Sequence, residues 1–408
     1  MKIVRHSIRW SAALSLALLA LACSSDAPLL AGDGATTLSD AQRSDAGIPT
    51  AVPLLPPGQH PAAIVGFPGV LPLATSLSVD AHFAEAIDHG MTVGRVQVDW
   101  RDLELTEGQY TLSELETQLS SLADLGLRPM LLLAALDGEA LVPDDLQDLL
   151  DAGEFVDGDV FTSRFALLLD RVIPMLVQHG GWSITVINEP ANYLDDYPEN
   201  EQARQIDASV NFTAAASDHV HSIDPRIAVT VTFRDGHALN SGAPYTARFL
   251  EHCDIASFNF YYGDVSNLTG TPLQSPIDPN GVREEIVELI AIADGKEVVI
   301  QEVGLHAGYE DRASPTGTSL DLQRQYLEIF FEEIAKEPII RTAVWFTMVD
   351  FDPGTAELLV APLRDEGISE SFIDAFLETL VTSGLLRFAD GSERPAWSSF
   401  VEALDGAY

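Results

Sequence analysis

Short apolar runs alternate along the chain with longer segments in which apolar residues recur every three or four positions. The runs have the length and β-branched composition of buried strands, and most are followed by a helical pattern. They cover residues 62–67, 94–100, 129–136, 183–188, 226–233, 254–262, 297–304 and 341–348. Strands that alternate with helices predict a parallel sheet. Because no repeat or linker interrupts residues 61–408, the pattern predicts one α/β domain, a (β/α)8 TIM barrel.

The amino-terminal part of the chain does not share this pattern. Residues 1–22 place basic residues ahead of an apolar stretch too short to span a bilayer, which predicts an export signal. The segment ends in L-A-L-A-C and resembles a bacterial lipoprotein signal, in which Cys23 is lipidated; a plain signal peptide cut near Ala22 is the alternative. Residues 23–60, rich in Ser, Ala, Asp, Gly and Pro, predict a tether. We expect an exported bacterial protein, anchored by lipid to the outer membrane or cell surface, or otherwise periplasmic or secreted.

Charge and composition exclude several kinds of partner. The formal charge is −40, from 62 acidic and 22 basic residues, so nucleic acid is not an expected partner. Lipidation of Cys23 would leave Cys253 without a partner for an internal disulfide. The sequence contains no metal-binding histidine motif, no phosphate-binding loop and no G-x-S-x-G elbow. We therefore expect no metal and no cofactor, and we expect a monomer.

Two of the predicted strands end in a carboxylate. The run S-I-T-V-I-N-E-P, residues 183–190, leads into Asn188 and Glu189 before a proline ends the strand, and E-V-V-I-Q-E-V-G, residues 297–304, carries Glu302 near its end. The two glutamates are 113 residues apart, or three strand–helix units of about 35–40 residues, which places them on strands 4 and 7. Either glutamate alone could be a solvated loop charge. Two carboxylates across a barrel mouth are what glycosidic bond cleavage needs.

The ordered set of motifs resembles glycoside hydrolase clan A, the retaining (β/α)8 glycosidases. It consists of V-I-N-E-P and I-Q-E-V-G, supported by R-V-Q-V-D-W, E-G-Q-Y-T-L, N-F-Y, V-W-F and D-G-S-E-R-P-A-W, and it covers nearly everything after Pro61. The resemblance implies hydrolysis of β-glycosidic bonds in an oligo- or polysaccharide through a covalent glycosyl-enzyme. Strands 3 and 6 lack the histidines usual in family 5, so family 5-like and family 39-like assignments both stay open.

The resemblance also implies roles for the residues around the two carboxylates. Glu302 would be the nucleophile and Glu189 the acid/base. Asn188 would bind the sugar 2-hydroxyl, an interaction that strengthens toward the transition state. Arg95 would lie beside Glu302 and keep it ionised while Glu189 stays protonated, and Tyr261 would hold the Glu302 carboxylate.

Three further residues are candidates for contact with the sugar. Trp345, near the end of strand 8, would be the stacking platform of the −1 subsite, with core packing as the alternative reading. Trp100 is equally open between sugar contact and packing. Asn259 shares one face of its strand with Tyr261 by period-2 alternation.

Loops at the mouth would determine the sugar, the linkage and endo or exo action. They comprise residues 137–159, which are polar and read as irregular, 191–200 and 352–383. A protein of another class, a carbohydrate-binding surface lipoprotein that keeps a barrel without turnover, would fit the tether and the acidic surface equally well. The intact pair of glutamates argues against it.

Overall fold

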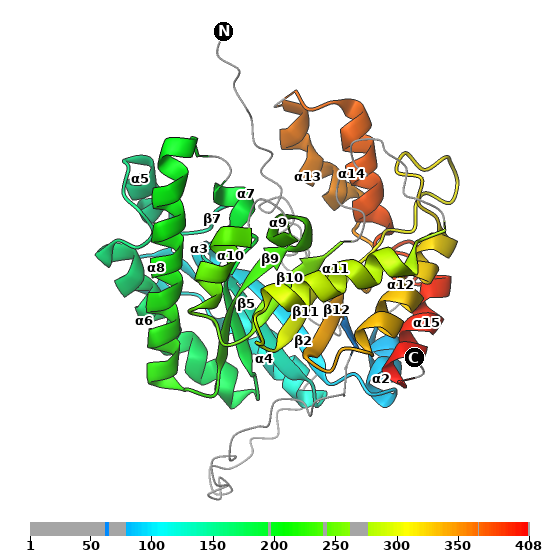
Figure 1. The fold of residues 1–408 in the computed structure, drawn as a ribbon, viewed down its shortest axis with the longest axis horizontal. Helices are drawn as coiled ribbons and strands as arrows, with labels where there is room; N and C mark the ends of the chain where they lie inside the picture. The colour runs from blue at the N-terminus through cyan, green and yellow to red at the C-terminus, as the bar shows by residue number, and fades with distance from the viewer. Residues whose placement is uncertain are drawn as a thin grey trace, which may run out of the picture.

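A computed structural model describes the barrel (Figure 1). The described residues are 62–64, 79–194, 197–239, 243–261, 276–365 and 367–406. The predicted signal segment, Cys23 and the whole of the predicted tether lie outside them and stay predictions. The strands of the barrel are β1 (Ala62–Ile64), β2 (Val93–Asp99), β5 (Arg128–Ala134), β8 (Ser183–Asn188), β9 (Ala228–Arg234), β10 (Ala256–Phe260), β11 (Val298–Val303) and β12 (Ile340–Trp345).

The strands pair in parallel and in chain order. β2 lies next to β5, the pairing continues through β8, β9, β10, β11 and β12, and β12 pairs with β1. β1 also contacts β2, which closes the circle. The prediction of a (β/α)8 barrel is confirmed, and with it the placement of Glu189 after the fourth strand and of Glu302 on the seventh.

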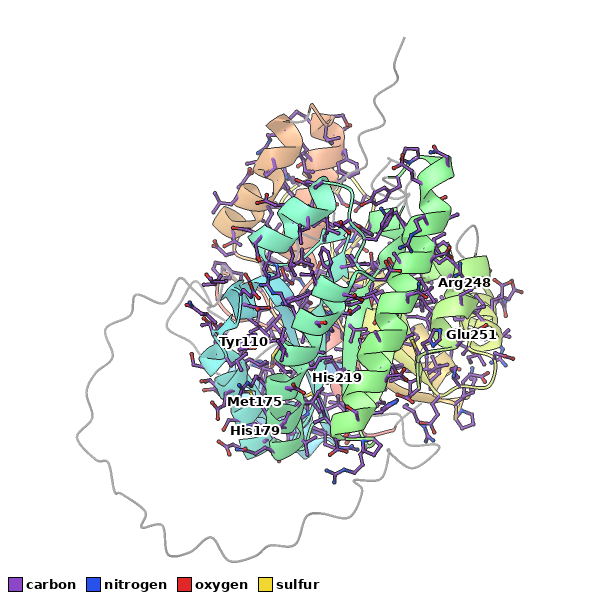
Figure 2. The ribbon with its side chains drawn as sticks, turned by 90° about the vertical axis from the view of Figure 1, so that its left-hand side faces the viewer. Tyr110, Met175, His179, His219, Arg248 and Glu251 are labelled. Carbon is purple, nitrogen blue, oxygen red and sulfur yellow. The ribbon has the colours of Figure 1, made fainter. Side chains whose placement is uncertain are left out.

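Helices surround the strands. They are α2 (Asp80–Asp88), α4 (Ser113–Asp124), α6 (Asp159–Gln178), α8 (Glu199–Ile223), α10 (Ala243–Leu250), α11 (Pro279–Ile292), α12 (Leu320–Ile334) and α15 (Pro395–Leu404). α6 and α8 lie side by side on the face shown in Figure 2, where His219 of α8 contacts Asp170 of α6 at 2.9 Å. Among the described residues, no helix combines the length and apolar composition needed to cross a bilayer.

Further elements occupy the carboxyl ends of the strands. They are α3 (Trp100–Leu103), β3 (Glu104–Thr106), β4 (Gln109–Tyr110), β6 (Leu136–Asp137), β7 (Glu139–Ala140), α5 (Asp144–Asp151), α7 (Pro190–Leu194), α9 (Asp235–Leu239), α13 (Pro353–Asp365) and α14 (Glu370–Thr382). The prediction that residues 137–159 are irregular is wrong, because they contain a short hairpin and α5. Residues 352–383 fold into the pair α13–α14, which stands at the same end of the barrel as α7 and α9 (Figure 1).

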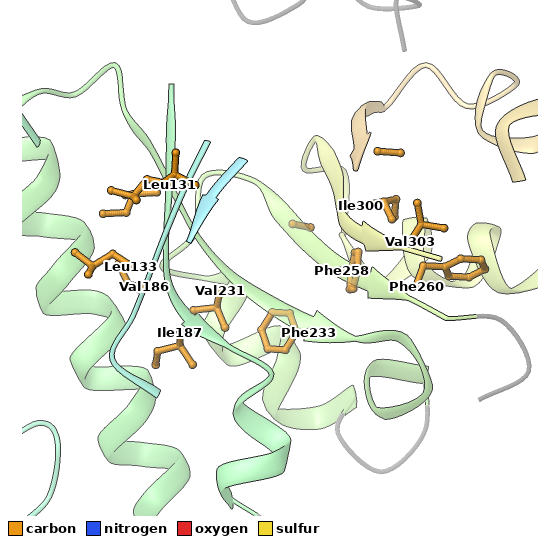
Figure 3. Close-up of a cluster of buried hydrophobic side chains, with 14 of the residues drawn as sticks. Leu131, Leu133, Val186, Ile187, Val231, Phe233, Phe258, Phe260, Ile300 and Val303 are labelled. Carbon is orange, nitrogen blue, oxygen red and sulfur yellow. The ribbon is translucent and has the colours of Figure 1, made fainter. Parts of the chain in front are cut away.

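The apolar core lies mainly between the strands and the surrounding helices. Alternate residues of neighbouring strands, such as Leu131, Val186 and Phe258, point into this layer (Figure 3). The opposite face of the strands is polar at the centre of the barrel. There the Gln301 side-chain oxygen accepts hydrogen bonds from Thr185 at 2.6 Å and Thr232 at 2.8 Å. This division places polar chemistry inside the barrel and leaves most of the stability to the outer layer.

Candidate active site

Glu302 is held by side chains from two other strands. Its Oε1 accepts a hydrogen bond from Arg95 Nη2 at 2.7 Å, and its Oε2 accepts one from the Tyr261 hydroxyl at 2.7 Å. Arg95 lies in the middle of β2, and Tyr261 directly follows β10. Arg95 and Glu302 are removed from bulk solvent, at 1% and 4% exposed, whereas Tyr261 is half-buried. The structure brings together the residues that the sequence predicted around Glu302.

Burial affects the pKa of Glu302 more than its pairing with Arg95 does. Burial raises the pKa of Glu302 above its usual range, and the charge of Glu189 adds to this, while Arg95 and Tyr261 act in the opposite direction. The predicted effect of Arg95 is present, but burial outweighs it. Burial and the neighbouring charge of Glu302 also raise the pKa of Tyr261 well above its usual value. The Tyr261 hydroxyl therefore keeps its proton and donates a hydrogen bond to Glu302.

Glu189 lies at the barrel mouth in unlike surroundings. Its backbone has φ of 42°, in the left-handed region that residues other than glycine rarely adopt, and its N–H donates to the Thr232 carbonyl at 2.8 Å. The Asn259 amide donates to Glu189 Oε1 at 2.8 Å and lies 3.4 Å from Asn188 Oδ1. Asn259, predicted to contact substrate, is fully buried and contacts Glu189 instead. Asn188 is beside Glu189, as the sequence requires.

The two tryptophans do not line the site. Trp345 is fully buried, and its ring lies 6.1 Å from that of Tyr326 on α12, in the layer between strands and helices. Trp100 is also fully buried; its indole N–H donates to Glu104 at 2.9 Å and its ring lies 4.9 Å from that of Phe165. A ring enclosed on all sides cannot stack on a sugar. The predicted sugar contacts of Trp345 and Trp100 are therefore wrong, and packing was the correct alternative.

Phe346 is the aromatic residue that the sequence reading passed over. It follows Trp345, so its side chain takes the opposite face, and it joins Val344 and Phe351 in a cluster separate from the outer core. A Cβ at Gly304 would meet the Phe346 carbonyl oxygen at 2.6 Å and the Tyr261 ring at 3.7 Å. This close approach requires glycine two residues after Glu302, and it puts the Phe346 backbone beside the site.

Two aspartates near the mouth were also missed. Asp235, the first residue after β9, accepts hydrogen bonds from the backbone N–H groups of Tyr261 at 3.0 Å and Gly236 at 2.7 Å. Asp99, the last residue of β2, is buried, and burial raises its pKa to about 7. Both follow the rule that identified Glu189, a carboxylate where an apolar run ends. Within the described ranges, no group of three or more His, Cys, Asp and Glu side chains is placed to hold a metal ion.

Known proteins match this chain in structure only. No protein-family model and no curated protein matches the sequence. A GH5_18 protein from Bifidobacterium longum subsp. longum, in complex with Manb1-4GlcNAc, is 15% identical with a TM-score of 0.59, over 81% of this chain and 73% of that one. An exo-beta-1,4-mannosidase from an Opitutaceae bacterium is 16% identical with a TM-score of 0.58, over 85% and 59%. Beta-glucuronidase 2 from Bacteroides uniformis is 14% identical with a TM-score of 0.54, over 86% and 35%.

At these identities the comparisons show the fold. The chain is a (β/α)8 barrel of the kind found in glycoside hydrolases, and the resemblance to clan A, on the family 5-like side, agrees with the names of the matching structures. Those structures are named for different sugars, a mannoside in one case and a glucuronide in another. The shared fold therefore says nothing about which sugar this chain accepts.

Proposed function

We propose that this chain is a retaining, family 5-like glycoside hydrolase of clan A that cleaves β-glycosidic bonds. The observation that carries the proposal is the pair of glutamates at the ends of strands 4 and 7, placed in different surroundings. Glu302 is buried between Arg95 and Tyr261, whereas Glu189 is half-buried and bonded to the neutral amide of Asn259. Carboxyl groups in unlike environments can divide the roles of nucleophile and acid.

In the first step the Glu302 carboxylate attacks the anomeric carbon while Glu189 gives its proton to the departing oxygen. Arg95 and Tyr261 each engage one oxygen of Glu302, so the carboxylate is oriented before substrate arrives. In the second step Glu189 takes a proton from water, which displaces Glu302 from the sugar. Retention requires the two carboxyl groups to lie about 5–5.5 Å apart, which leaves no room for a water molecule between Glu302 and the sugar.

Substrate contacts follow from the same geometry. Asn188 binds the 2-hydroxyl next to the reacting carbon, where a hydrogen bond strengthens as the ring flattens. β-1,4-Mannosides are the first substrates to test, because a bound Manb1-4GlcNAc and a β-1,4-mannosidase occur among the matching structures. We also propose that the protein is exported and anchored through Cys23. A Cys23→Ser variant that still incorporates labelled fatty acid would disprove the anchor.

The two glutamates are expected to fail differently when removed. On an aryl β-mannoside with a good leaving group, Glu189→Ala retains some turnover, because departure then needs little proton transfer. Added azide raises its rate and gives a glycosyl azide of unchanged anomeric configuration. Glu302→Ala gives no such product, since no glycosyl-enzyme forms.

The control is wild-type enzyme with and without azide, whose products show the starting configuration. A reversed pattern between the two variants would exchange their roles. Binding of β-mannans, glucans, xylans and galactans without release of reducing ends would favour the rival, a carbohydrate-binding protein without turnover.

A further inference from the structure

Asp235 stands where the pairing of β9 and β10 stops. The register of these strands ends at Arg234 opposite Asn259, because the chain enters α9 at Asp235. The next backbone donor on the β10 side that needs a partner is the N–H of Tyr261. Asp235 Oδ2 accepts this N–H at 3.0 Å, and Oδ1 accepts the N–H of Gly236 at 2.7 Å. The Asp235 carboxylate thus accepts a β10 backbone N–H at the point where β9 ends and no longer offers a backbone carbonyl.

The same tyrosine reaches Glu302 at its other end. From a backbone fixed by Asp235, the Tyr261 ring extends to place its hydroxyl 2.7 Å from Glu302 Oε2. The Tyr261 side chain is long and its ring is rigid. A small rotation of the Tyr261 backbone therefore moves the hydroxyl away from the Glu302 carboxylate. Asp235 is 4% exposed, and charge-assisted bonds of this kind are about twice as strong as neutral ones.

We propose that Asp235 is a positioning residue for the reaction: it fixes the Tyr261 backbone and thereby keeps the Tyr261 hydroxyl on Glu302. The inference rests on the proposed function of Glu302 as nucleophile. It adds a carboxylate from a fifth strand to the site, one that acts through Tyr261 and does not touch the sugar.

The chain supplies a matched control at the other end of the same two strands. Asp254, just before β10, accepts the backbone N–H of Val229 on β9 at 2.7 Å. Asp254 and Asp235 thus make the same kind of carboxylate-to-backbone bond across β9 and β10. Asp254 is exposed and its Oδ2 also contacts His221 at 2.9 Å. Only the bond of Asp235 leads to Glu302, so Asp254→Asn shows what the loss of such a carboxylate does to the enzyme away from the site.

The pH profile of kcat/KM distinguishes positioning from structure. The charged and titratable groups that face Glu302 are Arg95 from β2, Glu189 after β8 and Tyr261 after β10, and the Tyr261 hydrogen bond lowers the Glu302 pKa. Losing that bond raises the pKa, so the acid limb moves to higher pH. We expect Asp235→Asn to lower kcat/KM by about 10- to 100-fold, mainly in kcat, and to move the acid limb in the same direction as Tyr261→Phe.

A double-mutant cycle completes the test. The variant that combines Asp235→Asn with Tyr261→Phe is expected to have a kcat/KM no more than about threefold below that of Tyr261→Phe alone. Both substitutions act on the same contact, the hydrogen bond from Tyr261 to Glu302. Asp254→Asn keeps the wild-type profile. If Asp235→Asn folds poorly, Asp235→Ser takes its place and is judged by the same profile.

Two results would overturn the inference. One is an Asp235→Asn variant whose acid limb lies at the wild-type pH. The other is a double variant in which the effects of Asp235→Asn and Tyr261→Phe on kcat/KM multiply. Both apply when Glu302→Ala is inactive. Substantial activity of Glu302→Ala would instead overturn the proposed function, and this inference with it.

Discussion

Two buried glutamates of this protein differ in what surrounds them. Glu302 in the barrel is bonded to Arg95 and Tyr261, and the charge of Glu189 acts on it. Glu378 on α14 is completely buried beside the loop that follows β11. Its partners are the Tyr309 N–H at 2.9 Å, the Ser314 hydroxyl at 2.9 Å and the Thr316 hydroxyl at 2.6 Å.

Burial alone therefore does not mark a catalytic carboxylate. The donors to Glu378 all come from one loop segment and are neutral, so the carboxylate clamps that loop to α14. The partners of Glu302 come from separate strands and are ionisable, and Glu189 opposes its charge. The difference predicts that replacing Glu302 abolishes turnover, and that replacing Glu378 lowers stability and leaves turnover in the folded enzyme nearly unchanged.

The largest expected effect separates the two glutamates by activity. Glu302→Gln is isosteric but cannot form a glycosyl-enzyme, so kcat should fall by about four orders of magnitude or more. Glu378→Gln should keep kcat within about threefold of wild type in the folded enzyme, because it touches no reacting atom. Initial rates on an aryl β-glycoside, with folded protein confirmed by circular dichroism, decide this. Comparable losses in both variants would break the comparison.

Stability should depend on Glu378. Glu378→Ala leaves the Tyr309 N–H and the hydroxyls of Ser314 and Thr316 buried without their acceptor, which should cost about 3 kcal/mol in the free energy of unfolding. The exposed Glu284 on α11 is the control, and Glu284→Ala should change the value by less than about 0.5 kcal/mol. Urea denaturation measures both. Equal denaturation midpoints for the two variants would show that the hydrogen bonds of Glu378 contribute nothing to stability.

The smallest effect is the pH dependence of stability that comes from His306. This side chain contacts Thr316, one of the partners of Glu378, at 2.7 Å. Burial lowers the pKa of His306 to about 4 from 6.5. Between these values the unfolded chain binds a proton that the folded chain does not, so stability is complete above about 6.5 and is lost as pH falls toward 4, by at most about 3 kcal/mol. His306→Gln should flatten this slope.

Asp99 changes stability in the opposite direction over the same pH range. Its pKa is raised in the folded chain, so here the folded chain binds the extra proton and stability falls as pH rises. The test is therefore the difference between wild type and His306→Gln at each pH. A difference that does not change from pH 4 to 7 would show that His306 titrates alike in both states.

Much of the fold and the positions of the two candidate glutamates could be predicted because strand ends carry a plain signal. An apolar run that stops at a carboxylate located Glu189 and Glu302, and the resemblance to clan A placed Arg95 and Tyr261 beside Glu302. Trp345 could not be placed this way. Every residue of β12 is buried, so apolar identity does not show which face looks into the barrel. Phe346, one residue on, takes the other face.

Other failures occurred where the chain changes direction. Trp100 begins α3, so alternation along β2 no longer applies to it. α5 was missed because residues 144–151 are mostly acidic or polar and only Leu146 among them is fully buried. Asp235 satisfied the rule used for Glu189 but carried no motif beside it. Its role depends on a contact with Tyr261, 26 residues later, which only the folded chain shows.

The anomeric configuration of the first-formed product tests the central claim most directly. Wild-type enzyme is mixed with a β-glycoside it cleaves, and proton NMR is recorded before the released sugar mutarotates. Double displacement through Glu302 predicts that the β-anomer appears first and the α-anomer only later. First appearance of the α-anomer would mean a single displacement by water, and the assignment of Glu302 as nucleophile and Glu189 as acid/base would be wrong.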